Sequence, residues 1–181
     1  MLAIVELFHP HQHDLLHVEL RRWLAVHYAQ IVLFPLVALA VCSLVAGRSG
    51  VAATLCRVAM FVFAVSYIAF DTAAGVVSGV LVQAAHASAD LDSWRPAIQA
   101  IWDHPIVGGS SDGTPALAVI GTTAWLVGTL AAAAACRAAG RSWFAIALLV
   151  VSAFGLFVFR THAWPGGPVT FGALALAAAV M

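Results

Sequence analysis

Residues 58–85 read VAMFVFAVSYIAFDTAAGVVSGVLVQAA, an apolar run that carries a single acid, Asp71, near its middle. About 20 apolar residues, each rising 1.5 Å along a helix, cross the roughly 30 Å hydrocarbon core of a bilayer, so this run predicts a transmembrane helix. A carboxylate at that depth is costly unless it is paired, protonated or turned towards a polar cavity. The surroundings of Asp71 therefore decide what this helix does.

The composition excludes a soluble globular domain. Of the 181 residues, 63% are hydrophobic and only 9% are charged, and the mean hydropathy is +0.99. A soluble domain carries about 25% charged residues. The eight basic residues are balanced by eight acids, so nothing in the charge predicts binding to nucleic acid or a polybasic lipid-binding tail.

The other apolar runs complete an all-α integral membrane protein, a small bundle of about five transmembrane helices that forms one domain over 1–181. Residues 1–22 mix leucines with polar residues, which predicts an interfacial helix. The larger loop is predicted to carry a short interfacial helix, from residue 93 to 103, with Trp94 and Trp102 at the headgroup level. The expected spans are about 23–46, 53–86, 115–138, 143–159 and 169–181, and the loop is 87–114.

Five spans place the two ends of the chain on opposite sides of the membrane. The short turns at one face carry or adjoin arginines but no acid, which predicts that this face is cytoplasmic. The N-terminus is then outside, and the bacterial inner (plasma) membrane is the expected location. The other face has as many arginines, so the prediction depends on the shortness of these turns. The arginines in question are Arg48, Arg57, Arg137 and Arg141.

The predicted topology places all eight histidines, and every acid except Asp71, on the face opposite these turns. His13 and His17 are four residues apart, the spacing with which one helical face binds zinc. Asp14 stands where the zinc-protease motif has a glutamate, which is a departure from that motif. The alternative is a tail at the headgroup level whose histidines bind nothing.

Other histidines stand at or near the ends of predicted helices, where side chains from different helices can converge on a metal or a haem iron. The alternative is that each one bonds a carbonyl group or a lipid headgroup. The candidate metal ligands are His13, His17, His27, His104 and His162, and the candidate cofactor-binding residues are His27, Tyr67, His86 and His162. The expected occupant is zinc, iron, copper or haem b.

Small and polar residues share one face of the central helix, within about 120° of each other at 3.6 residues per turn. They are Tyr67, Asp71, Gly75, Ser78, Gly79 and His86. Gly75 and Gly79 form a small-xxx-small motif, which predicts close approach of another helix and possible association with a second copy or a larger complex. Asp71 then faces protein, either as a catalytic or proton-accepting group or as a buried acid held by hydroxyl groups such as that of Thr122.

Three functions fit these patterns. The first is a metal- or haem-binding membrane protein with redox or metal-dependent hydrolytic chemistry, and Asp71 as its catalytic residue. The second is a non-catalytic accessory or scaffold subunit of a membrane complex. The third is a small proton or cation transporter that uses Asp71. The sequence leaves open whether the protein is an enzyme, and all three functions share the lipid bilayer as an expected partner.

Overall fold

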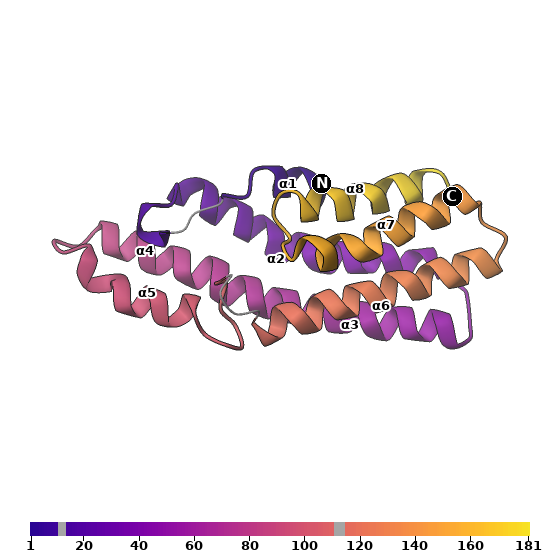
Figure 1. The fold of residues 1–181 in the computed structure, drawn as a ribbon, viewed down its shortest axis with the longest axis horizontal. Coiled ribbons are helices and arrows are strands. Elements are labelled where there is room, and N and C mark those ends of the chain that lie inside the picture. Colours follow the sequence, from indigo (N-terminus) through magenta and orange to yellow (C-terminus); the bar gives the residue numbers. More distant parts are fainter. Residues whose placement is uncertain (11–13, 111–114) are drawn as a thin grey trace.

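The computed structural model describes residues 1–10, 14–110 and 115–181, and shows an elongated, all-helical molecule without strands in these ranges (Figure 1). Three short non-α turns interrupt the α-helices: the 3₁₀ turns η1 (Leu15–His17) and η3 (Asp92–Trp94), and the π-helix η2 (Thr72–Val77). The α-helices are α1 (Leu2–Leu7), α2 (Leu20–Leu44), α3 (Val51–Asp71), α4 (Ser78–His86), α5 (Arg95–Trp102), α6 (Ala116–Ala138), α7 (Trp143–Phe159) and α8 (Gly166–Ala179).

Three helices have the length and composition of membrane spans, which indicates a membrane location. They are α2 with 25 residues, the continuous helix 51–86 with 36 residues, and α6 with 23 residues. The helices α7 and α8 are apolar but shorter, with 17 and 14 residues. The prediction of an all-helical protein is confirmed.

Local sequence explains where several helices begin and end. Glu19 and Ser142 begin α2 and α7, because their side chains accept hydrogen bonds from the backbone amides of Arg22 and Ala145. Gly50 precedes α3 with a φ of 102°, a backbone conformation that side chains disfavour.

The bundle half of the molecule contains α2, α3, α6, α7 and α8, which enclose the main core. Large aromatic side chains fill this core: Phe34, Phe63 and Trp125 are fully buried, and the ring centroids of Phe63 and Trp125 lie 4.9 Å apart. Burial of side chains of this size stabilises a protein by roughly 1.5–3 kcal/mol each in water. In a bilayer the same interlocking instead supplies packing contacts between helices.

The antiparallel register of α3 and α6 fixes the depth of Asp71. Tyr67 of α3 packs against Gly121 of α6. Met60, seven residues before Tyr67, packs against Gly128, seven residues after Gly121. Continuing this register by one turn places Asp71 level with the first turn of α6, which begins at Ala116. The sequence predicts an acid near the middle of a span, but Asp71 lies where the bundle ends.

Beyond Asp71, the helix continues through η2 and α4 into a second, smaller unit that we call the cap, formed by residues 14–18 and 78–102 (Figure 1). The cap has its own core, in which Leu16, Val82 and Ile98 pack together with Trp23 of α2. Its short helix α5 begins within two residues of the predicted interfacial helix. The predicted 1–22 helix is divided between α1, which packs on α8 and α2, and η1 in the cap.

A group of polar contacts fastens the cap. Arg95 of α5 donates to both carboxylate oxygens of Asp14 at 3.1 Å and to Asp92 at 3.2 Å. Partial burial alone would raise the pKa of Asp14, but hydrogen bonds from Arg95, the Leu16 amide and His17 hold that pKa below its usual value. The charged form of Asp14 is therefore the form that ties residues 14–17 to α5.

Candidate functional site: a buried acid and histidine cluster

Asp71 is the last residue of α3 and is only 1% exposed. Neither of its carboxylate oxygens has a hydrogen-bond partner among the residues that the structure describes. A buried carboxylate without donors loses its hydration and gains nothing in return, so the neutral acid or a charged partner is favoured. The group that stands beside Asp71 is consequently central to its chemistry.

That neighbour is His27 of α2. The Nδ1 atom of His27 lies 2.7 Å from the backbone oxygen of Trp23, and a carbonyl oxygen can only accept, so Nδ1 carries a hydrogen. In the neutral ring Nε2 is then an acceptor, and it lies 3.8 Å from Oδ1 of Asp71. The pair can exist as a carboxylic acid beside a neutral imidazole, or as a carboxylate beside an imidazolium.

The glycines of the small-xxx-small motif make room for this pair. A Cβ atom at Gly75 would overlap the His27 ring, and one at Gly79 would meet Leu24 and Trp23. The Trp23 indole also donates to the backbone oxygen of Gly75 at 2.7 Å. The helix that approaches this face is thus α2 of the same chain, whereas association with another copy or a larger complex stays a prediction.

A second acid and histidine pair lies beside the first. Glu6 and Gln30 are fully buried, and the Gln30 amide donates to Glu6 at 2.9 Å. The Nδ1 atom of His162 lies 3.2 Å from the Gln30 amide nitrogen and 3.3 Å from Oε2 of Glu6. One ring nitrogen cannot accept from Gln30 and donate to Glu6 at once, so the position of a proton between His162 and Glu6 decides which contact forms.

His9 joins the two pairs. Its ring centroid lies 5.0 Å from that of His27 and 4.9 Å from that of His162. The Nδ1 atom of His9 lies 3.0 Å from the backbone oxygen of Pro10. We call these six residues the acid–histidine cluster: Glu6, His9, His27, Gln30, Asp71 and His162.

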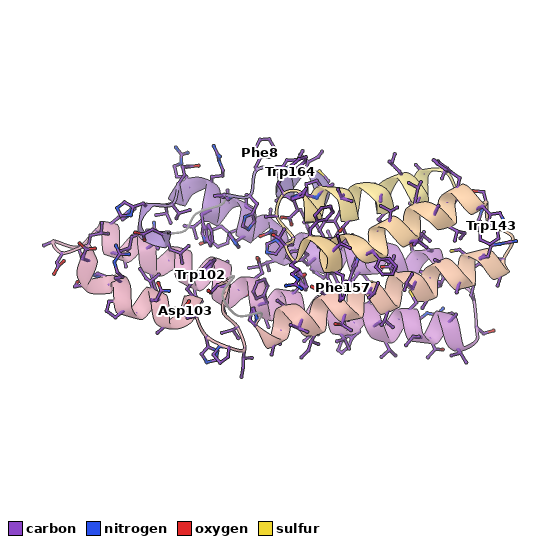
Figure 2. All side chains as sticks on the ribbon, in the orientation of Figure 1. Phe8, Trp102, Asp103, Trp143, Phe157 and Trp164 are labelled. Atoms are coloured by element: carbon purple, nitrogen blue, oxygen red, sulfur yellow. The ribbon has the colours of Figure 1, made fainter. Side chains whose placement is uncertain are left out.

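Apolar groups close the cluster on two sides. Towards the main core, the rings of Phe34, Tyr67 and Phe70 surround His162 with centroid distances of 5.8, 6.1 and 6.0 Å. Towards the cap, the Trp102 ring lies 6.0 Å from that of Trp23, and Figure 2 shows Trp102 at the end of α5 that faces the middle of the molecule. The cluster therefore lies between two apolar cores.

The other candidate residues lie elsewhere. The Nε2 atom of His86 lies 2.8 Å from the backbone oxygen of Leu16, in the cap. Exposed His17 contacts Asp14 at 3.0 Å, and His104 accepts from the Ile106 amide at 3.2 Å. The hydroxyl group of Tyr67 bonds Thr122 at 2.9 Å, on the bundle side of the cluster. The remaining candidate ligand, His13, lies outside the described residues.

The described residues do not support the metal and haem interpretation. Within them, no group of three or more His, Cys, Asp or Glu side chains is arranged to hold a metal ion. His27 is engaged at Nδ1 by the Trp23 carbonyl, and its Nε2 lies 3.8 Å from a carboxyl oxygen of Asp71. The geometry instead brings His27 close to Asp71 and His162 close to Glu6.

Sequence reasoning selected His27, Asp71 and His162 but missed Glu6, His9 and Gln30 as site residues. Glu6 is an acid inside the apolar run 1–8, and Gln30 is an amide inside a predicted span. Both are the kind of polar residue in an apolar helix that marks a functional position. The signal was present, but the folding of α1 onto α8 could not be read from it.

Comparison with known proteins provides no further guide: this chain matches no family model, no curated protein and no solved structure.

Proposed function

We propose that this protein is a small proton-translocating membrane protein in which Asp71 carries the proton. The observation that carries the proposal is the carboxyl group of Asp71, which is 1% exposed, lacks a hydrogen-bond donor among the described residues and lies beside Nε2 of His27. An ionisable group buried in a membrane bundle is by default a functional group. The π-helix η2 that follows Asp71 is a further mark of a functional segment.

The chemistry is a proton exchange between acid and imidazole. The proton on Asp71 passes to Nε2 of His27, which leaves a carboxylate beside an imidazolium and keeps the pair neutral overall. The same exchange between Glu6 and His162 occurs within hydrogen-bond reach, at 3.3 Å. His9 lies between His27 and His162, so the two acid–histidine pairs are close enough for the charge of one to affect the other. Loss of a proton by one pair therefore favours uptake of a proton by the other pair.

Three buried hydroxyl groups support a route from the cluster through the bundle. Thr129, Ser152 and Thr170, in α6, α7 and α8, are fully buried, and the described residues offer no hydrogen-bond partner to their oxygen atoms. Buried polar atoms of this kind commonly bind water. We propose that water bound at these hydroxyl groups forms part of the proton route through the bundle.

The proposal includes the finer topology. We take α2, 51–86, α6, α7 and α8 as five membrane-crossing helices in a bacterial inner membrane, with the cap and the N-terminus outside and the arginine-bearing turns in the cytoplasm. The acid–histidine cluster then lies at the outer boundary of the bilayer, from which protons can be drawn. The metal-binding and scaffold alternatives have no comparable observation in their favour.

Proton flux into liposomes tests the proposal. We expect reconstituted wild-type protein to carry protons down an imposed gradient, measured with a pH-sensitive dye inside the vesicles, and Asp71→Asn to reduce the flux to that of empty liposomes. Asp103→Asn is the matched control, because Asp103 is exposed at the end of α5 and bonds Gln99. Wild-type flux no greater than that of empty liposomes, or flux unchanged in a folded Asp71→Asn protein, would contradict the proposal.

A further inference from the structure

The end of the bundle opposite the cap carries four arginines, and no acid is present in the sequence of the two turns there, 42–58 and 134–146. We call it the arginine end. It is formed where α2 ends, α3 begins, α6 ends and α7 begins (Figure 1). Its positive charge is thus uncompensated by any carboxylate of these turns. The four residues are Arg48, Arg57, Arg137 and Arg141.

Three of the four guanidinium groups are engaged by the protein itself. Arg57 donates at 2.9 Å to the backbone oxygens of Val45 and Arg48, which fastens the turn between α2 and α3. The guanidinium of Arg137 lies 4.3 Å from the centroid of the Trp143 ring, and that of Arg141 donates to the backbone oxygen of Met181. These contacts give the three side chains structural roles.

Arg48 is the exception. No hydrogen bond or ion pair to its guanidinium group comes from the described part of the chain. It lines a hollow of about 300 Å³ between the start of α3 and the end of α6, together with Ser49, Gly50 and a wall of alanines such as Ala135 and Ala138. The hollow is at the small end of the range for sites that bind small molecules, which suits a headgroup-sized ligand.

The surroundings of the hollow have the character of a membrane interface. Trp143 and Phe144 are 69% and 65% exposed, and Figure 2 shows Trp143 at the end of the molecule opposite the cap. Exposed aromatic residues next to arginines are typical of the headgroup layer. Val51, which lines the hollow, is an apolar side chain with 85% exposure, so the same site offers apolar surface to an acyl chain.

We propose that this hollow binds an anionic phospholipid, with the phosphate group paired to the guanidinium of Arg48. Basic pockets between membrane helices on the cytoplasmic side are typical sites for such headgroups. Arginine is suited to the role because its planar fork donates two parallel hydrogen bonds to a phosphate. The inference is independent of proton transfer at Asp71, which lies at the other end of the bundle.

The test uses the full chain in nanodiscs that contain equal amounts of phosphatidylglycerol and phosphatidylcholine. Native mass spectrometry of the released protein should show retention of phosphatidylglycerol over phosphatidylcholine, and Arg48→Gln should reduce that preference at least several-fold. Arg48→Lys should keep part of it, because a lysine retains the charge but not the fork. Arg21→Gln, on the cap side, is the matched control and should behave as wild type.

Several results would overturn the proposal. One is equal retention of the two lipids by wild-type protein, and another is an unchanged preference in Arg48→Gln protein whose helical content by circular dichroism equals that of wild type. A third is displacement of the lipid by millimolar inorganic phosphate, which would identify a free-anion site. Asp71→Asn should keep the lipid preference even where it loses proton flux, so failures of the two proposals can be told apart.

Discussion

No described group donates a hydrogen bond to the carboxyl group of Asp71. Its negative charge is therefore stabilised only when a neighbouring group such as His27 takes up the proton. The Nε2 atom of His27 lies 3.8 Å from Oδ1 of Asp71. Glu6, by contrast, accepts a hydrogen bond from Gln30 at 2.9 Å. Two buried acids in one cluster therefore occupy different environments, which is the usual way in which one acid exchanges protons while another stays fixed.

This difference predicts opposite effects on stability. Asp71→Asn should leave the melting temperature unchanged or raise it, because a neutral amide replaces an acid that has no donor to lose. Glu6→Gln should lower it, because the amide oxygen can still accept from Gln30 but the charged oxygen beside Nδ1 of His162 is lost, at a cost of about 1–3 kcal/mol. Thermal unfolding in detergent measures both, and a larger loss for Asp71→Asn than for Glu6→Gln would show that Asp71 is a structural acid.

A second prediction concerns Gly75. Gly75→Ala should destabilise the protein by about 1–3 kcal/mol and disturb the cluster, because the added methyl group overlaps the His27 ring. Gly172→Ala in α8 is the matched control, since nothing lies within 4 Å of a Cβ there. An alanine at such a helical position should stabilise by roughly 0.5–1 kcal/mol. Equal melting temperatures for the two variants would argue against close packing of α2 on Gly75.

At the scale of elements, the cap is a separate layer that shields the cluster. Residues 14–18 contact α4 and α5 through the small apolar core and through the hydrogen bond of His86 to Leu16 at 2.8 Å. The ion pairs of Arg95 with Asp14 and Asp92 add to this. Because Asp14 and Arg95 are both well exposed, each pair contributes little alone and is screened by salt.

The cap should loosen in acid. The pKa of Asp14 is lowered in the folded protein from its usual 3.8, so its ion pair contributes stability above that value and loses it as the pH falls through the lowered pKa. We expect quenching of cap tryptophans by acrylamide to rise as the pH falls below about 4. In Asp14→Asn the higher quenching should already be present at pH 7. A pH profile that is identical in wild type and Asp14→Asn would assign the opening to other acids.

Sequence reasoning located the helices well and the site only in part, for identifiable physical reasons. The apolar runs fix α6 and α7 to within a residue, because helix length and composition are local properties. The side to which His86 turns was not predictable, since it depends on the fold of residues 14–18 across the cap. Glu6 and Gln30 meet only because α1 folds back onto α8 and α2, a contact that no periodicity encodes.

Across the whole molecule, the groups of polar and charged side chains described above lie at the two ends of an apolar bundle. The acid–histidine cluster and the cap occupy one end, and the arginine end occupies the other (Figure 1). The segment Val51–Asp71 has 21 residues, which at 1.5 Å each spans about 30 Å, the thickness of the hydrocarbon core. The cluster and the lipid hollow are thus one bilayer thickness apart.

This arrangement predicts the accessibility of single cysteines. In a protein with Cys42, Cys56 and Cys136 replaced by alanine, a membrane-impermeant maleimide should label Ala89→Cys in intact spheroplasts. It should label Ser49→Cys only after the membrane is permeabilised. Both positions are exposed in the structure, so labelling reports the side of the membrane and not burial. Labelling of both from the same side would reject the five-span topology.

The π-helical turn η2 has a geometric consequence for the two halves of the molecule. A π-helical turn accommodates one residue more than an α-helical one, and each residue of an α-helix accounts for roughly 100° of rotation about its axis. The wider turn between Asp71 and Ser78 therefore absorbs one extra residue without rotating α4 away from the direction that a regular helix would give it. Deleting a single residue of 72–77 should let the helix run on as an ordinary α-helix with His86 still turned towards Leu16, whereas the same deletion within α4 would rotate His86 by about 100°.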